Sequence, residues 1–248
     1  MAYSEQTVQW VRPWSPRTFS FAVTRPRGLV FRNGEFVTLG LRREGKLVAR
    51  AYSIVSTPDQ DHLEFLSIHV PDGPLTSLLA RISPGQTVWV NDKPTGTLTL
   101  NHVQPGRVLY MLATGTGLAP FMSLVRHPET HRRFQHVVLV HSVRTVAELA
   151  YREELTARED GRFHYVPTVT REPFATQERG ADLFRSGELS RRLGLPAPEP
   201  EVDRVMVCGN PAMTREMTEF LKTHGWTPTN HKGVGNFTTE LAFVLRES

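Results

Sequence analysis

The sequence predicts two folded parts, an all-β part followed by an α/β part with a doubly wound parallel sheet. Short β-rich runs separated by Gly, Pro and Asn turns fill residues 1–105. From residue 106 onward, apolar runs alternate with helical patterns, as in sheets whose strands are buried on both faces. The length of 248 residues suits one large or two small domains, and we place a boundary between residues 105 and 106.

The first part contains six β-rich runs at the spacing of a barrel or a sandwich. They are Thr18–Val23, Phe36–Leu41, Ala51–Val55, Leu63–Val70, Thr87–Val90 and Thr97–Leu100. One helix is predicted among them, because four apolar residues recur at helical spacing, namely Leu75, Leu78, Leu79 and Ile82. Pro74 would be its first residue, a position where proline is favoured.

The second part alternates strands with helices. Apolar runs predict buried parallel strands at Val108–Ala113, Val137–Val140, Phe163–Val169 and Arg204–Cys208. Helical patterns follow at Ala119–Arg126, Ala147–Arg158, Glu188–Leu193 and Pro211–His224. The tail, Val234–Val244, predicts a last strand that closes this sheet or reaches back to the first part.

Composition excludes several classes of protein. The only cysteine, Cys208, excludes an internal disulfide and an iron–sulfur cluster of ordinary ligation, and it fits a reducing, cytoplasmic compartment. The sequence has no signal peptide and no apolar run of about 20 residues, so we expect no membrane insertion. No block of five like charges occurs, so we expect no nucleic-acid partner. Pro128 interrupts the pair His127 and His131, so we expect no metal site there.

The net charge of +4 lies mostly in the first part. Residues 1–104 hold 11 Lys and Arg against 8 Asp and Glu, which leaves 18 against 17 for the remainder. This excess fits a solvated surface, an acidic partner protein or a phosphate-bearing ligand.

A glycine-rich turn stands between the first buried strand and its helix. It reads Thr114-Gly115-Thr116-Gly117, and Pro120 stands where a dinucleotide fingerprint would have its third glycine. The free amides at such a helix start favour a pyrophosphate. A plain strand-to-helix turn is the alternative.

Three arginines follow the second and third buried strands, namely Arg144, Arg171 and Arg179. An NAD-binding fold would place Asp or Glu near Arg144 to bond the ribose 2′-hydroxyl, whereas arginine suits a 2′-phosphate. Single arginines usually decorate a surface, but three near the strand ends of one sheet favour NADP over NAD.

Two further segments carry residues suited to a ligand. In Arg50-Ala51-Tyr52-Ser53, an arginine suits a phosphate and an aromatic ring suits a planar group, but an alternating strand with Tyr52 in the core explains the segment equally well. Cys208-Gly209-Asn210 ends the last apolar strand, where ligands bind in such folds. A buried thiol that packs as a small hydrophobe is the alternative there.

Taken together, these segments resemble the bacterial ferredoxin (flavodoxin)–NADP reductases along nearly the whole chain. The pieces occur in the family's order: RAYSIVS at 50–56, HVPDGPLTS at 69–77, GTGLAPFMS at 115–123, HSVR at 141–144, TREPF at 170–174, CGNPAM at 208–213 and AFV at 242–244.

The resemblance implies a six-stranded antiparallel FAD-binding β-barrel over residues 1–105 and a parallel-sheet NADP(H)-binding domain over residues 106–248. It implies that Arg50 binds the FAD phosphates, that Tyr52 stacks on the isoalloxazine ring and that Ser53 approaches flavin N5. The other FAD contacts it implies are Ala51, His69, Val70, Pro74, Leu75, Thr76, Thr116, Ala242 and Phe243. Within the tail, Ala242 would abut the isoalloxazine and Phe243 would stack on the FAD adenine.

The same resemblance implies that Arg144, Arg171 and Arg179 hold the 2′-phosphate of NADP. Cys208 would lie beside nicotinamide C4 as a wall of the pocket, so that Tyr52, Ser53 and Cys208 would surround the reacting rings as catalytic residues. The other NADP contacts it implies are Gly115, Gly117, Val143, Thr170, Gly209, Asn210 and Met213.

The implied reaction is reversible electron transfer, in which a hydride passes from nicotinamide C4 to flavin N5 and electrons then leave singly to an acidic ferredoxin or flavodoxin. We expect a monomer. The nearest rivals are the reductase component of an oxygenase system and an NADPH-dependent free-flavin reductase. A nonenzymatic NADP-binding or redox-sensing module is a rival of another class, which the intact RAYS and GPLTS segments argue against.

Overall fold

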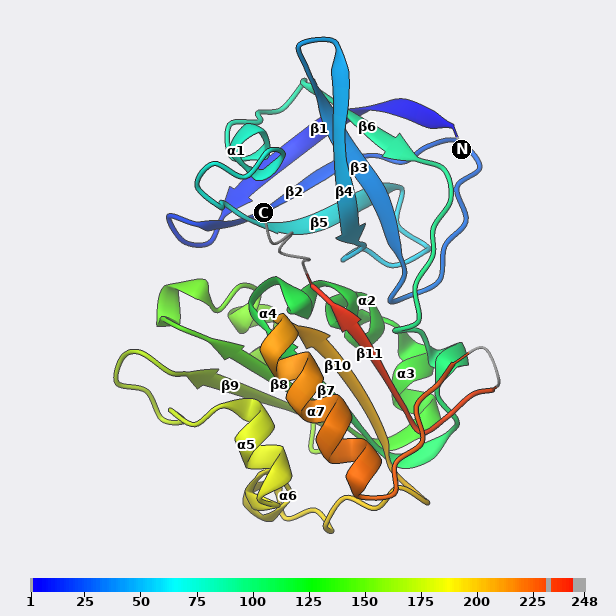
Figure 1. The fold of residues 1–248 in the computed structure, drawn as a ribbon, viewed down its shortest axis with the longest axis vertical. Helices are drawn as coiled ribbons and strands as arrows, with labels where there is room; N and C mark the ends of the chain where they lie inside the picture. Colours follow the sequence, from blue (N-terminus) through cyan, green and yellow to red (C-terminus); the bar gives the residue numbers. More distant parts are fainter. Residues whose placement is uncertain (1, 231–232, 243–248) are drawn as a thin grey trace.

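The computed structural model describes residues 2–230 and 233–242. A curled six-stranded antiparallel sheet lies above a five-stranded parallel sheet with helices on both of its faces (Figure 1). This arrangement confirms the predicted fold class. The boundary between residues 105 and 106 stays a prediction, although the first strand of the parallel sheet begins at Gly106.

The six-stranded sheet closes on itself at only one point. Its strands are β1 (Tyr3–Pro13), β2 (Thr18–Thr24), β3 (Phe36–Arg43), β4 (Lys46–Ser53), β5 (His62–Ile68) and β6 (Thr87–Asn91), in the order β4-β3-β6-β1-β2-β5. The two edge strands, β4 and β5, are joined by the isolated bridge between Ile54 and Phe65. Apolar side chains such as Phe21, Leu39 and Phe65 fill the interior. The sheet is therefore a barrel that stays largely open along the β4–β5 edge.

The structure corrects three predictions in this part. Strand β1 is additional, because its residues are mostly polar and only alternate side chains such as Gln6 and Val8 are buried. The predicted strand Thr97–Leu100 is wrong, since this stretch is irregular and leads into a 3₁₀ turn, Leu100–His102. The predicted first helical residue is wrong as well, because α1 is a single turn, Thr76–Leu79, and Pro74 lies before its cap residue Leu75.

The five-stranded sheet is parallel throughout. Its strands are β7 (Gly106–Thr114), β8 (Phe134–Val143), β9 (Phe163–Val169), β10 (Arg204–Gly209) and β11 (Phe237–Leu241), in the order β11-β10-β7-β8-β9. The tail strand thus closes the sheet beside β10. Its predicted range was too long, and Phe243 and Val244 lie outside the described residues.

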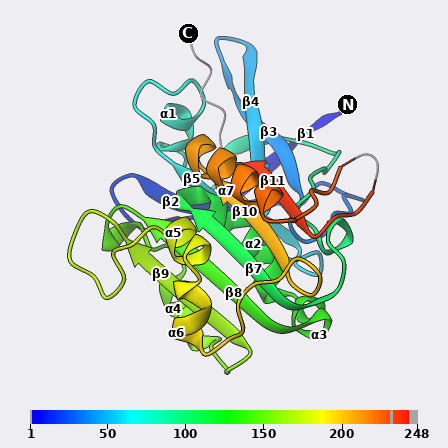
Figure 2. The ribbon, with the colours of Figure 1, turned by 60° about the horizontal axis from the view of Figure 1, so that its bottom comes forward.

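Six helices of the described residues cover the two faces of this sheet (Figure 2). One face packs against α2 (Leu118–Arg126), α3 (Pro128–Arg133) and α4 (Arg152–Ala157). The other face packs against α5 (Gly180–Arg185), α6 (Glu188–Leu193) and α7 (Pro211–Thr223).

The prediction of one helix over Ala147–Arg158 is wrong. A 3₁₀ turn, Val146–Glu148, precedes α4, and Tyr151 between the turn and α4 has a φ of 58°. Neither α3 nor α5 was predicted from the sequence.

A buried ion cluster joins the two sheets. Arg126 of α2 donates to Glu64 of β5 at 2.6 Å and to both oxygens of Glu154 of α4 at 2.8 Å. The Tyr151 hydroxyl donates to the second oxygen of Glu64 at 2.7 Å, and its ring packs on Trp14 of the first part with centroids 4.7 Å apart. The cluster therefore links elements on both sides of the junction.

Candidate functional site

The site lies where the strand order of the parallel sheet reverses, between β7 and β10. Ligands of open α/β sheets bind outside the carboxyl ends of the strands at such a point. The turn after β7, Gly115–Gly117, packs directly on the end of β10: a Cβ on Gly117 would lie 2.2 Å from the Cys208 carbonyl oxygen. The Thr114 hydroxyl accepts from the Asn210 amide at 2.8 Å. The structure thus brings together the two predicted segments at this edge.

Two of the predicted residues after β10 organise the chain there. The Asn210 side chain caps α7 by accepting from the Met213 amide at 2.9 Å. The Ala242 amide donates to the Gly209 carbonyl at 3.0 Å, so the tail lies against the Cys208–Asn210 segment. Phe243 lies outside the described residues.

Cys208 is buried, with 2% of its surface exposed. Burial raises the pKa of the Cys208 thiol, and the charge of Glu240 raises that pKa further. The side chain is therefore a neutral thiol, which is a poor nucleophile.

We expect the single cysteine to resist alkylation in the folded protein. Iodoacetamide at pH 8 should modify Cys208 at least ~100-fold more slowly in buffer than in urea, because reaction needs an exposed thiolate. Mass spectrometry of the intact chain over time measures the modified fraction. Equal rates in buffer and in urea would contradict the buried, protonated thiol.

Glu240 is a site residue that sequence reasoning missed. It pairs in register with Cys208 across β10 and β11. Its Oε1 accepts from the Thr97 amide and from the Thr97 hydroxyl, the latter at 3.1 Å. Burial raises the pKa of Glu240, although the hydrogen bonds from Thr97 act to lower it. The sequence does carry a signal for Glu240, because a carboxylate stands in the β-rich tail two residues before Ala242.

The predicted arginines follow β8 and β9 side by side. The Arg171 amide donates to the Arg144 carbonyl at 2.9 Å, and the Thr170 amide to the Val143 carbonyl at 3.1 Å. Arg179 is the cap residue of α5, whose first residue, Gly180, donates to the Ser142 hydroxyl of β8 at 3.0 Å. All three arginines are exposed, and in the part of the chain that the structure describes none pairs with a carboxylate. Their guanidinium groups are therefore unpaired, although Glu148 and Glu172 lie at the same edge and accept from the backbone amides of Arg144 and Val146.

On the other side of the junction, β4 carries the predicted residues Arg50 to Ser53. Alternation along the strand places Arg50 and Tyr52 on one face and Ala51 and Ser53 on the other. The Tyr52 hydroxyl lies 3.1 Å from Ser67 Oγ of β5, and its ring meets Phe21 and Phe65 edge-on. Burial raises the pKa of Tyr52 to about 12, against the lowering effects of Ser67 and Arg50. Tyr52 thus spans the open edge of the barrel while Arg50 beside it is exposed.

The predicted segment His69–Thr76 lies next to the end of β5. The His69 amide donates to the Arg17 carbonyl at 2.6 Å, and the Thr76 hydroxyl lies within 3.2–3.3 Å of the backbone of Val70. Leu75 is buried in the barrel, whereas Pro74 is exposed.

The residues present suit a flavin dinucleotide. The open β4–β5 edge combines an exposed guanidinium (Arg50), an aromatic ring (Tyr52) and an apolar side chain that is 39% exposed (Val70). The Arg50 guanidinium donates to the Ala49 carbonyl at 2.7 Å and forms no ion pair within the described residues. Leu241 at the carboxyl edge of the parallel sheet is also apolar and is 46% exposed. A planar apolar ring with a phosphate tail would cover these groups and pair the charge.

Between residues 2 and 230 and between 233 and 242, no three His, Cys, Asp or Glu side chains gather as possible metal ligands. No helix in those same ranges is long and apolar enough to cross a membrane.

Matches to known proteins cover nearly the whole chain. Residues 11–99 match the family described as oxidoreductase FAD-binding domain, and residues 111–219 match the oxidoreductase NAD-binding domain. The chain is 44% identical to a ferredoxin–NADP reductase of Pseudomonas aeruginosa over 98% of both chains. It is also 44% identical to a flavodoxin/ferredoxin–NADP reductase of Rhodobacter capsulatus, over 96% of this chain and 93% of that one.

A solved structure agrees with these relatives. The crystal structure of a ferredoxin–NADP reductase from Neisseria gonorrhoeae with bound FAD and NADP superposes with a TM-score of 0.93 at 32% identity. The match covers 98% of this chain and all of that one. On this fold, this site and these relatives, the chain belongs to the ferredoxin–NADP reductase family.

Proposed function

We propose that this chain transfers electrons between NADP(H) and a ferredoxin or flavodoxin through bound FAD. The observation that carries the proposal is a shared location. One edge of the parallel sheet holds three unpaired arginines, a glycine turn and a buried thiol, and this edge lies next to the open edge of the barrel. Bound FAD would supply the exchange between a hydride and single electrons, which is chemistry of the cofactor itself. The protein would bind, orient and shield the reacting groups.

We assign FAD to the open β4–β5 edge of the barrel. Arg50 would pair with its phosphates, and Tyr52 and Ser53 would contact the isoalloxazine from β4. His69 and Val70, together with Pro74, Leu75 and Thr76, would hold the ribityl and pyrophosphate groups. The remaining contacts are those implied by resemblance: Ala51 on β4, Thr116 in the turn after β7, and Ala242 in the tail.

We assign NADP(H) to the carboxyl edge of the parallel sheet. Arg144, Arg171 and Arg179 would hold the 2′-phosphate, because charge-assisted bonds from guanidinium groups suit phosphate oxygens. Gly115, Gly117 and the Gly209–Asn210 turn would admit the remainder of the nucleotide to close backbone approach. Cys208 would form the wall of the nicotinamide pocket as a neutral thiol, and Glu240 would hold the tail on Thr97.

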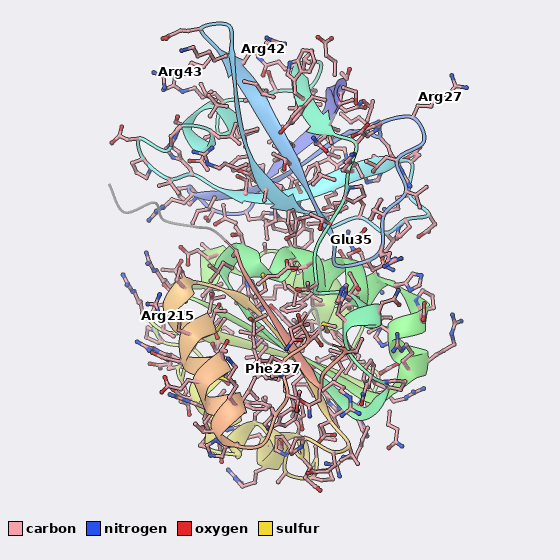
Figure 3. The ribbon with its side chains drawn as sticks, turned by 45° about the vertical axis from the view of Figure 1, so that its right-hand side comes forward. Arg27, Glu35, Arg42, Arg43, Arg215 and Phe237 are labelled. Atoms are coloured by element: carbon pink, nitrogen blue, oxygen red, sulfur yellow. The ribbon has the colours of Figure 1, made fainter. Side chains whose placement is uncertain are left out.

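We propose that the electron carrier is acidic. The excess positive charge of the first part includes Arg42 and Arg43, which lie at the end of the β3–β4 hairpin that points away from the parallel sheet (Figure 3). Neither pairs with a carboxylate in the described chain. Exposed charge of one sign steers an oppositely charged protein and raises its association rate. A monomer in the cytoplasm is part of the same proposal.

Stopped-flow mixing tests the proposal. The purified yellow protein is expected to be reduced by NADPH far faster than by NADH, and then to reduce a ferredoxin or a flavodoxin. The second-order rate for the carrier should fall at least ~10-fold between low salt and about 0.5 M salt, because screening removes the steering. A protein without a flavin spectrum would overturn the proposal. Activity with free flavin alone would favour the free-flavin reductase, and activity only with an oxygenase component would favour that rival.

A further inference from the structure

A fully buried histidine lies beneath the glycine turn. His141 stands near the carboxyl end of β8, in register with Ala113 on β7 and Pro167 on β9, and its side chain is fully buried. Its Nε2 lies 3.1 Å from the Gly115 carbonyl oxygen. The function described above gives this histidine no role.

The hydrogen bond fixes the tautomer of the ring. A carbonyl oxygen only accepts, so Nε2 carries the proton and donates it to Gly115. Nδ1 is then an acceptor, and it is one of three buried side-chain atoms without a partner in the described structure. Burial lowers the pKa of His141 to about 4, so the ring is neutral near pH 7.

An unpartnered buried nitrogen carries a cost. It loses the hydrogen bond that water would supply, and an apolar side chain of the same size would not. The Gly115 carbonyl has a second donor in the Leu118 amide, so it does not need His141 to be satisfied. Stability of the fold therefore does not account for a histidine at this position.

The geometry of the peptide unit indicates what His141 does. The C=O and N–H of one trans peptide point in opposite directions. With the Gly115 carbonyl held toward His141 inside the sheet, the Thr116 amide of the same peptide unit points outward. Gly115 has a φ of 52°, and a Cβ there would meet nothing within 4 Å, so the outer side of the turn is open.

We infer that His141 is a positioning residue, which turns the Thr116 amide toward bound NADP(H) by holding the Gly115 carbonyl on the opposite side. The inference rests on the proposed placement of NADP(H) at this edge. His141 would act only on the half of the nucleotide near the turn, because the arginines at the ends of β8 and β9 hold the other half.

Two ligands and two variants test the inference. His141→Met keeps the size of the side chain and removes the donor, whereas His141→Gln keeps a donor. For His141→Met we expect the Kd for NADP⁺ to rise roughly 3- to 10-fold, as for the loss of one hydrogen bond. The Kd for adenosine 2′-phosphate, which has no nicotinamide or pyrophosphate, should change less than about 2-fold, and the Tm should not fall.

His141→Gln should bind NADP⁺ within about 2-fold of the original protein. His136→Met, on the same strand but away from the turn, is the control.

The outcomes separate the possibilities. Unchanged NADP⁺ affinity in His141→Met would overturn the inference. A lower Tm together with equally weaker binding of NADP⁺ and adenosine 2′-phosphate would also overturn it, because that result indicates a purely structural residue. An unaltered protein that binds no NADP⁺ would instead overturn the proposed function. NMR of the unaltered protein needs no variant: we expect a protected Nε2–H resonance of His141 that shifts with NADP⁺ and not with adenosine 2′-phosphate. An Nδ1–H tautomer would contradict the inference.

Discussion

Replacing Arg144 by glutamate is expected to raise the KM for NADPH by roughly 100-fold or more and the KM for NADH by less than about 3-fold. Arg144 is exposed, and within the described chain its guanidinium has no acidic partner, so its charge is free for a ligand. In the proposed site, the substitution would remove a charge-assisted bond to the 2′-phosphate and add repulsion. NADH has no 2′-phosphate and loses neither. Steady-state kinetics with both nucleotides and one dye acceptor measures the two constants.

A matched variant controls for the change of net charge. Arg185→Glu alters the charge by the same amount at the far end of α5, where Arg185 pairs with Asp182 and not with the predicted site. It should leave the preference for NADPH unchanged. If Arg144→Glu affects NADPH and NADH equally, the 2′-phosphate lies elsewhere.

Replacing Arg126 by methionine is expected to lower the free energy of unfolding by about 3–5 kcal/mol, because Glu64 would remain buried without its cation. Glu64 has 5% of its surface exposed, and Arg126 joins it to Glu154 across the junction of the two sheets. In a chain of this size the Tm should fall by roughly 6–20 °C. Urea unfolding followed by flavin fluorescence and by circular dichroism measures the loss.

Two further variants make this test specific. Arg158 also pairs with Glu154, at 3.2 Å, but 40% of its side chain is exposed, so Arg158→Met should cost less than about 1 kcal/mol. Adding Glu64→Gln to Arg126→Met should recover part of the lost stability, because the uncompensated charge is gone. Equal losses for Arg126→Met and Arg158→Met would show that the buried cluster does not hold the sheets together.

Local pattern predicted those elements whose own residues decide their conformation. The strand Phe163–Val169 and the helix Glu188–Leu193 have the predicted bounds. The helix expected over Ala147–Arg158 is interrupted at Tyr151, whose side chain reaches Glu64 and Trp14 of the first part. Contacts so distant along the chain leave no periodic signal, and the polar strand β1 likewise depends on its neighbours for its conformation.

In the site, too, local sequence pattern predicted some residues, whereas others depend on contacts that are distant along the chain. Arg144 and Arg171 were expected together, because the carboxyl ends of neighbouring parallel strands meet at one edge. Glu240 was missed, because its partner Thr97 is 143 residues away and the tail had no certain place in the sheet order. Burial at Cys208 and His141 also depends on the whole fold, so their protonation states follow only from the structure.

The state of Cys208 bears on the resistance of the protein to oxidative damage. Bound FAD, once reduced, would supply electrons to dioxygen as well, and the peroxide would arise close to the nicotinamide pocket that we assign to Cys208. Oxidation of cysteine to sulfenic acid and beyond starts from the thiolate. A thiol that burial and a neighbouring carboxylate keep protonated offers peroxide little to attack. In the site that we propose, the only thiol of this chain would stand near the source of such oxidants, in the protonated form that they oxidise most slowly.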